Sequence, residues 1–205
     1  MTATVLLVRH GETIWNRDGR IQGWADSTLT ERGREQARAL GSHLDSEYDL
    51  DRLVASDLQR TRETAALLDE AGIGPDPAFE RAWRERDFGD WQGLTRAEIA
   101  ERLPEYDPDG SLLAVASVPG GESLGAAERR VLDGWERLVA EVGDGETAAV
   151  VTHGGPIRAV IAAVSGRDLA AVAPEFSPTN CGVTAIRCAT EPAVVRRDAT
   201  GHLSL

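Results

Sequence analysis

Three short apolar runs, each followed at once by polar residues or glycine, limit what this chain can fold into. They cover residues 5–8, 53–55 and 148–152 and consist mainly of valine, leucine and alanine. Runs of this length are typical of buried strands. Segments with the apolar spacing of amphipathic helices separate them. Strands that alternate with helices predict an α/β sandwich around a largely parallel sheet.

Capping residues predict where several helices begin. Serine and threonine often precede a helix because their side-chain oxygens accept hydrogen bonds from its free backbone N–H groups. Proline suits the first helical position. The predicted starts are Thr30 before residues 31–44, Ser56 after the second strand, Thr95 in a capping box with Glu98, Ser123 before the longest helix, and Pro156 at the start of a helix to about Val164.

The remaining segments read as loops or short strands. Residues 13–28 have little periodicity, and a long irregular loop in a small domain is often functional. Residues 80–93 combine aromatic, arginine and acidic side chains without a clean period, and residues 104–121 are irregular. Near the end of the chain, residues 183–186 and 193–195 predict a hairpin or edge pair.

Length and charge exclude several classes of protein. The 205 residues predict one domain, residues 1–205, with a well-buried core. The formal net charge of -12 argues against general binding to nucleic acids or anionic membranes. All 22 basic residues are arginine, which excludes a Schiff-base lysine and a Walker-type nucleotide loop. Any phosphate site must therefore be a local concentration of arginine.

Cysteine and targeting patterns give two further expectations. Cys181 and Cys188 have no CxxC spacing, so neither a disulfide framework nor a thiolate metal site is expected. The N-terminal run is too short for a signal peptide, and no apolar segment approaches the roughly 20 residues that span a bilayer. We expect a cytoplasmic protein.

The three predicted strands end in residues that carry chemistry. His10 and His153 follow the first and third strands and each precedes a glycine, while Ser56 and Arg60 follow the second strand. In a parallel sheet these ends open on one edge, where α/β proteins bind ligands. Singly, each histidine reads as a buried structural residue. Together they predict a site.

Five blocks in this chain resemble the histidine phosphatase superfamily, also called the phosphoglycerate mutase-like family, and they occur in the family's order between residue 5 and about residue 160. Each block alone is a weak motif, but five in register are specific. Residues after about Leu169 carry little of the resemblance. The blocks are Leu7-Val8-Arg9-His10-Gly11-Glu12-Thr13 with Trp15-Asn16 and Gln22-Gly23, then Ala55-Ser56-Asp57-Leu58-Gln59-Arg60-Thr61, Glu85-Arg86-Asp87-Phe88-Gly89-Asp90-Trp91-Gln92-Gly93, Pro119-Gly120-Gly121-Glu122-Ser123, and Val151-Thr152-His153-Gly154-Gly155.

The resemblance implies a three-layer α/β/α sandwich and a metal-independent phosphomonoesterase with no cofactor. It makes His10 the nucleophile that becomes phosphohistidine, and Glu85 the proton donor to the leaving oxygen. A neutral imidazole is a competent nucleophile near neutral pH, and we expect a backbone carbonyl in the Gly11 turn to hold its other nitrogen. The phosphate would be bound by Arg9, Arg60 and His153, with Asn16, Gln22, Gly23, Arg86 and Gly154 on the substrate side.

The implied substrate is a small phosphorylated metabolite, with inorganic phosphate as product. Its specificity would come from Trp24, Trp83, Arg86, Trp91 and residues 104–121. A homodimer is compatible with the resemblance, because many members of the family dimerise.

Three other interpretations remain open. A cofactor-dependent phosphoglycerate mutase is the first, although the expected basic segment is acidic here: Arg96 and Arg102 lie among Glu98, Glu101, Glu105, Asp107 and Asp109. A catalytically silent phosphate-binding module is the second. A metal site made of His10, His153 and Glu85 is the third, and neighbouring arginines argue against it.

Overall fold

The computed structural model describes residues 2–70, 72, 74–103, 106–107, 112 and 115–203. Six strands of this part of the chain form one sheet, in the order β3-β2-β4-β1-β5-β6. The first four in that order are parallel, and the last two join antiparallel. The strands are β1 (Ala3–Arg9), β2 (Arg52–Ser56), β3 (Ala78–Glu80), β4 (Thr147–Thr152), β5 (Val183–Cys188) and β6 (Ala193–Ala199).

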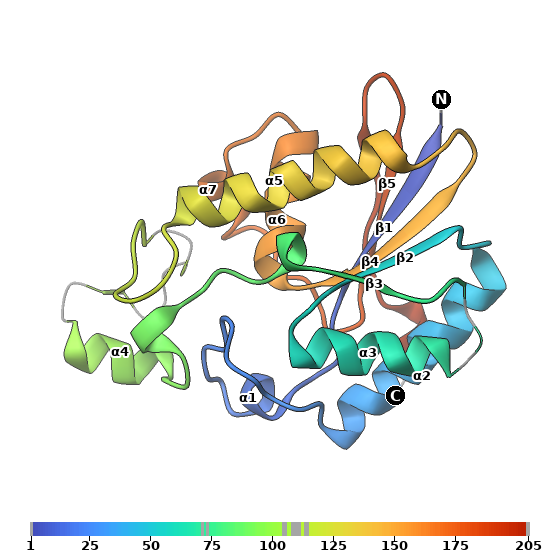
Figure 1. Cartoon of the computed structure of the whole chain (residues 1–205). Helices are drawn as coiled ribbons and strands as arrows, with labels where there is room; N and C mark the ends of the chain where they lie inside the picture. The colour runs from blue at the N-terminus through green and yellow to red at the C-terminus, as the bar shows by residue number, and fades with distance from the viewer. Residues whose placement is uncertain are drawn as a thin grey trace.

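Helices cover both faces of the sheet. Figure 1 shows α5, α6 and α7 on one face and α2 and α3 on the other. This arrangement confirms the three-layer α/β/α sandwich with a mostly parallel sheet. The helices are α1 (Ile14–Arg17), α2 (Glu31–Glu47), α3 (Gln59–Asp69), α4 (Arg96–Arg102), α5 (Leu124–Glu141), α6 (Gly154–Val164) and α7 (Leu169–Val172), with 3₁₀ turns η1 (Arg81–Trp83), η2 (Gly89–Trp91) and η4 (Gly201–Leu203).

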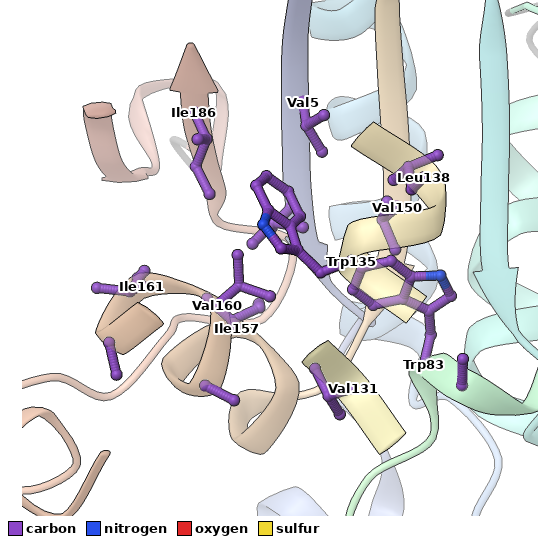
Figure 2. Close-up of a cluster of buried hydrophobic side chains, with 14 of the residues drawn as sticks. Val5, Trp83, Val131, Trp135, Leu138, Val150, Ile157, Val160, Ile161 and Ile186 are labelled. Carbon is purple, nitrogen blue, oxygen red and sulfur yellow. The ribbon is translucent and has the colours of Figure 1, made fainter. Parts of the chain in front are cut away.

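The side chains of β1 alternate between the two hydrophobic layers. Val5 and Leu7 pack in the cluster beneath α5 and α6, which Figure 2 shows, whereas Leu6 and Val8 pack in the cluster beneath α2 and α3. Successive side chains of a strand point to opposite faces of a sheet. A strand covered on both faces is therefore apolar at every position, which explains why this run shows no alternation in the sequence.

Three predicted helix starts are confirmed by their caps. The hydroxyl of Thr30 accepts a hydrogen bond from the backbone N–H of Gly33, and Ser123 accepts one in the same way at the start of α5. Thr95 and Glu98 form the predicted capping box at α4. The predicted terminal hairpin is also present as β5 and β6.

Three local predictions need correction, and one strand was not predicted. Ser56 does not cap α3, whose first flanking residue is Leu58, without a side-chain cap. Pro156 is the third residue of α6, since the helix already begins at Gly154. Residues 13–28, predicted as a loop, contain the short helix α1, which begins with a capping box between Thr13 and Asn16. The strand β3 has only three residues, too few for a periodic pattern to be visible in the sequence.

A third, smaller hydrophobic cluster lies beyond the sheet edge, where α4 is seen in Figure 1. It includes Ile21, Phe88, Trp91, Ile99 and Tyr106. Part of the predicted irregular stretch 104–121 belongs here, but residues 104–105, 108–111 and 113–114 lie outside the described residues, Glu105 and Asp109 among them.

Within the part of the chain that the structure describes, we find no helix with the length and apolarity needed to cross a membrane.

Candidate phosphoryl-transfer site

The ends of β1, β2 and β4 meet at one edge of the sheet, as their parallel pairing requires. The backbone N–H of His10 donates to the carbonyl of Thr152, so His10 and His153 lie side by side. Gly11 then passes so close to α2 that a Cβ atom there would stand 2.5 Å from the carbonyl oxygen of Gly33. Only glycine fits this turn, which explains its place after the histidine.

His10 is held in the form that a nucleophile needs. Its Nδ1 lies 2.8 Å from the backbone oxygen of Gly11, which confirms the expected carbonyl partner. Such a bond puts the ring proton on Nδ1 and leaves the Nε2 lone pair free. Burial, followed by the charges of Arg60 and Arg9, lowers the pKa of His10 well below its usual value. The ring is therefore neutral near pH 7.

Side chains outside the sequence predictions fix the backbone around His10. The hydroxyl of Thr64 on α3 accepts a hydrogen bond of 3.1 Å from the N–H of Gly11. The amide of Asn180 donates to the carbonyl oxygen of His10 at 2.8 Å. Asn180 lies in the C-terminal part of the chain, where no motif marked it. Its contact depends on the return of the chain as β5, next to β1.

His153 is buried and contacts Ser56, the last residue of β2, and Arg60 on α3. Its Nε2 lies 2.9 Å from the hydroxyl of Ser56, and its Nδ1 accepts a hydrogen bond of 3.2 Å from Nε of Arg60. Burial, followed by the charge of Arg60, lowers the pKa of His153 well below its usual value. Direct contact of His153 with a phosphoryl group, which the resemblance implies, stays a prediction.

Arg9 and Arg60, the two predicted phosphate-binding arginines, both line the cavity. Arg60 is almost completely buried, and two of its nitrogens donate to the carbonyls of Gly23 and Ala25 at 2.7 and 3.2 Å. Burial lowers its pKa to about 10, so it remains charged at neutral pH. Arg9 donates to the carbonyl of Pro178 at 2.6 Å, and its buried Nε has no partner among the described residues. A phosphate oxygen would satisfy such a donor.

The cavity beside His10 has a volume of about 290 Å³. Four of the five predicted substrate-side residues line it: Asn16, Gln22, Gly23 and Gly154. The carboxamide oxygen of Asn16 accepts hydrogen bonds from Thr13, which leaves its N–H₂ group as the available donor. Gly154 opens α6, so its backbone N–H is one of those that a helix leaves free for an anion.

Glu85 is the acidic residue of the cavity lining. Its two carboxylate oxygens accept hydrogen bonds from the backbone N–H groups of Arg86 and Gly155, at 2.9 and 3.0 Å. A Cβ atom on Gly155 would overlap this carboxylate, so any larger residue there would displace the Glu85 side chain. The carboxyl group is thereby fixed beside the cavity and available for proton transfer.

Arg86, like His153, is a predicted site residue that does not line this cavity, so its contact with substrate stays a prediction. It is 2% exposed, and its guanidinium donates to the carbonyls of Glu122, Val115 and Ala116 at 2.9, 2.7 and 3.3 Å. These bonds tie the segment after Glu85 to the loop before α5. The role of Arg86 in this geometry is to hold the backbone.

None of the three tryptophans expected on the substrate side lines the cavity. Trp83 is fully buried in the cluster under α5, as Figure 2 shows, and Trp91 packs against Tyr106. Trp24 does not line the cavity and instead contacts the backbone of Glu85. Aromatic residues at these positions could not be assigned from the sequence, because an aromatic side chain suits a core as well as a ligand.

Three arginines line the cavity in addition to those predicted. They are Arg20, Arg96 and Arg158. Arg158 lies one turn after Gly154 on the same face of α6, a spacing that could have marked it. Its Nε donates to the carbonyl of Phe176 at 2.6 Å, and burial lowers its pKa.

Charge in this cavity is opposite to that of the whole chain. Among the described lining residues there are five arginines and one carboxylate, in a protein of net charge -12. The cavity is thus the predicted local concentration of arginine. Guanidinium groups offer forked donors that match phosphate and carboxylate oxygens.

Fold and cavity together define an α/β protein with a site suited to a phosphoryl group. The chain belongs to the histidine phosphatase superfamily (branch 1), whose profile matches residues 5–199.

Relatives in this family include both mutases and phosphatases. The chain is 39% identical over 165 residues to the 2,3-bisphosphoglycerate-dependent phosphoglycerate mutase 2 of Gloeobacter violaceus, covering 78% of this chain and 74% of the relative. It is also 39% identical over 158 residues to the metal-independent phosphoserine phosphatase of Arabidopsis thaliana, covering 76% and 66%. A mycobacterial glucosyl-3-phosphoglycerate phosphatase, solved with VO3, has a TM-score of 0.85 at 30% identity, covering 96% of this chain and 98% of that one.

Proposed function

We propose that this protein is a metal-independent phosphomonoesterase that acts on a small phosphorylated metabolite through a phosphohistidine on His10. One observation carries the proposal: the Nδ1 of His10 is held by the Gly11 carbonyl, and burial with two arginines keeps the ring neutral. A neutral ring whose Nε2 lone pair is free beside an arginine-rich cavity suits nucleophilic attack on phosphorus.

In the first half of the reaction, Nε2 of His10 attacks phosphorus and the bond from phosphorus to the ester oxygen breaks. Arg9, Arg60 and the Gly154 N–H bind the equatorial oxygens, where charge is concentrated. Glu85 gives its proton to the leaving oxygen. The alcohol then departs and the phosphoryl group stays on His10.

In the second half, Glu85 takes a proton from a water molecule, and this water attacks phosphorus. The phosphorus–nitrogen bond breaks, inorganic phosphate leaves, and both residues return to their starting forms. His153 supports the clamp by orienting Arg60, because its Nδ1 accepts the Arg60 Nε–H. Splitting hydrolysis into two transfers in this way lowers each barrier.

The donor set supports a reaction without a metal. Both ring nitrogens of His153 are engaged with Ser56 and Arg60, and Nδ1 of His10 is engaged with Gly11. Two guanidinium groups would also repel a dication beside His10. This geometry favours the phosphohistidine interpretation over a zinc site made of His10, His153 and Glu85.

The charge of the cavity favours substrates with a second anionic group. A phosphate dianion balances the charge of two guanidinium groups. The five arginines and one glutamate of the cavity carry more positive charge than a single phosphate dianion can balance. Relatives named for phosphoserine, glucosyl-3-phosphoglycerate and phosphoglycerate support testing these compounds first. Phosphoserine and 3-phosphoglycerate therefore head the substrate panel.

Phosphoglycerate mutase activity is the second candidate, favoured by the identity to the Gloeobacter violaceus mutase. In a mutase the bisphosphorylated intermediate must stay bound while it turns. Interconversion of 3- and 2-phosphoglycerate with added 2,3-bisphosphoglycerate distinguishes the two activities. A rate of interconversion above the rate of phosphate release would replace the phosphatase proposal with the mutase.

The proposal is tested by phosphate release from p-nitrophenyl phosphate and the metabolite panel, with and without EDTA. We expect activity that EDTA leaves unchanged, and a reduction of at least about 10³-fold in His10→Ala. Rapid-quench mass spectrometry should find one phosphoryl group on His10. The matched control is His43→Ala on α2, a histidine outside the cavity, which should retain activity.

Two results would contradict the proposal. Activity lost with EDTA and restored by a metal would exclude the metal-free reaction. A wild-type protein that hydrolyses no member of the panel but binds inorganic phosphate would indicate the silent binding module instead.

A further inference from the structure

The backbone carbonyl of Glu85 is held by two side chains that do not line the cavity. The indole N–H of Trp24 donates to this oxygen at 2.7 Å, and Nη2 of Arg130 on α5 donates to it at 3.2 Å. Arg130 is itself fixed by two bonds to the carboxylate of Glu122, at 2.9 and 2.6 Å. The backbone beneath Glu85 is therefore fixed from two directions.

The ring of Trp24 is held in place by a group of arginines. The guanidinium carbons of Arg81 and Arg84 lie 4.7 Å from the ring centroid, and that of Arg130 lies at 5.9 Å. Arg84 is anchored in turn by two bonds to Asp57, at 2.6 and 2.7 Å. Cations at these distances from an indole are attracted by its π-system. The direction of the indole N–H is thereby set.

The residues on either side of Trp24 contact Arg60, which lines the cavity. The carbonyls of Gly23 and Ala25 accept hydrogen bonds from Arg60, at 2.7 and 3.2 Å. The side-chain oxygen of Gln92 accepts from the backbone N–H groups of Trp24 and Ala25. Gly23 and Ala25 thus contact Arg60 through their backbone, and Trp24 between them contacts Glu85 through its side chain.

We propose that Trp24 is a positioning residue that fixes the Glu85 carboxyl group relative to Arg60. This inference rests on the proposed function, in which Glu85 protonates the leaving oxygen. Proton transfer requires the donor within hydrogen-bond reach of that oxygen, and a displacement of about 1 Å can cost about 100-fold in rate. The bond from Trp24 to the Glu85 carbonyl limits such displacement.

Trp24→Phe tests the proposal, because it removes the indole N–H and keeps an aromatic ring for the arginines. The readout is kcat/KM for two esters: p-nitrophenyl phosphate, whose leaving group needs no proton, and the alkyl phosphate of the panel that the wild type hydrolyses fastest. Since kcat/KM reports the step that forms phosphohistidine, later steps do not mask the result. We expect a loss of about tenfold for the alkyl phosphate and less than twofold for p-nitrophenyl phosphate.

Two comparisons separate positioning from a general structural role. Glu85→Gln should show the same selectivity with a larger loss, about 100-fold on the alkyl phosphate. Inhibition by inorganic phosphate should be unchanged in Trp24→Phe, because Arg60 is held by backbone carbonyls that the substitution keeps. The matched control is Trp135→Phe, which makes the same change in the core under α5 and should affect neither ester selectively.

Equal losses on both esters, or weaker inhibition by inorganic phosphate, would overturn the proposal and show that Trp24 merely supports the loop. If Trp24→Phe does not fold, Arg130→Lys replaces it: this variant keeps the charge beside Glu122 but not the forked contact, and the same selective loss is expected. A uniform loss in Arg130→Lys would count against the proposal equally. A wild type inactive on every ester would overturn the proposed function, and this inference with it.

Discussion

The imidazole rings of His10 and His153 lie 5.2 Å apart, centroid to centroid, and their planes are inclined by 58°. They follow two neighbouring parallel strands, β1 and β4. Burial lowers the pKa of both rings, and Arg60 and Arg9 lower it further. Two neutral imidazoles thus lie side by side at neutral pH, where two imidazolium ions would repel each other and the arginines.

This pair should make the fold less stable in mild acid. The unfolded chain takes up protons on both histidines as the pH falls below about 6.5, but the folded chain does not, since its histidine pKa values are lowered. Between pH 7 and pH 5.5 we expect the free energy of unfolding to fall by about 1 kcal/mol for each histidine. Urea unfolding at a series of pH values measures this change.

In His153→Asn the free energy of unfolding should fall by about 1 kcal/mol less over the same window, because one histidine with a lowered pKa is absent. Above pH 7.5 the free energy of unfolding should have the same pH dependence in both proteins, because neither histidine titrates there. A slope that the substitution leaves unchanged would show that other groups cause the acid sensitivity.

Gly155→Ala should lower activity strongly and change the stability of the fold little. The new Cβ would overlap the Glu85 carboxylate, which would have to leave its bond to the N–H of residue 155. We expect kcat/KM on an alkyl phosphate to fall by about 100-fold. Gly125→Ala is the matched control near the start of α5, where a Cβ meets only the end of the Arg129 side chain. It should keep full activity and gain up to about 1 kcal/mol of stability.

Arg158→Met should weaken the binding of substrates that have a second anionic group more than the binding of substrates whose phosphate is the only anionic group. Arg158 lines the cavity, and its charge lies close enough to Arg9 to lower the pKa of that arginine, after burial as the main cause. We expect KM for phosphoserine or 3-phosphoglycerate to rise by about tenfold, and KM for p-nitrophenyl phosphate by less than threefold. Steady-state kinetics with each compound measures both. Equal increases would place Arg158 on the transferred phosphoryl group instead.

Arg86→Met should affect stability and not specificity. The substitution leaves the carbonyls of Glu122, Val115 and Ala116 without their donor, so we expect a loss of about 3 kcal/mol in the free energy of unfolding. At a temperature where the variant is folded, its KM for each ester should stay within about twofold of the wild type. A selective increase in KM for phosphoglycerates would restore the expected role of Arg86 in substrate binding.

The main chemistry was predictable because it follows from local pattern. A buried strand must be apolar, a turn that touches α2 must be glycine, and a histidine between the two is placed at the sheet edge by the strand itself. Position relative to a predicted strand or helix therefore identified Arg9, His10, Arg60 and His153. The same reasoning identified the helix caps Thr30, Thr95 and Ser123. The sequence therefore predicted three parallel strands of the sheet and the edge at which their polar residues meet, but neither β3 nor the strand order.

Which side chains share the cavity depends on the packing of the loops and could not be predicted from the sequence. Arg86 and Arg158 are both arginines near family motifs. Arg86 donates hydrogen bonds to backbone carbonyls, whereas Arg158 lines the cavity. Trp24 and Asn180 act through backbone atoms of Glu85 and His10, which are distant in the chain. Such contacts depend on how loops pack against one another. A sequence shows a side chain's chemistry, but its partner is chosen by the packing of the whole chain.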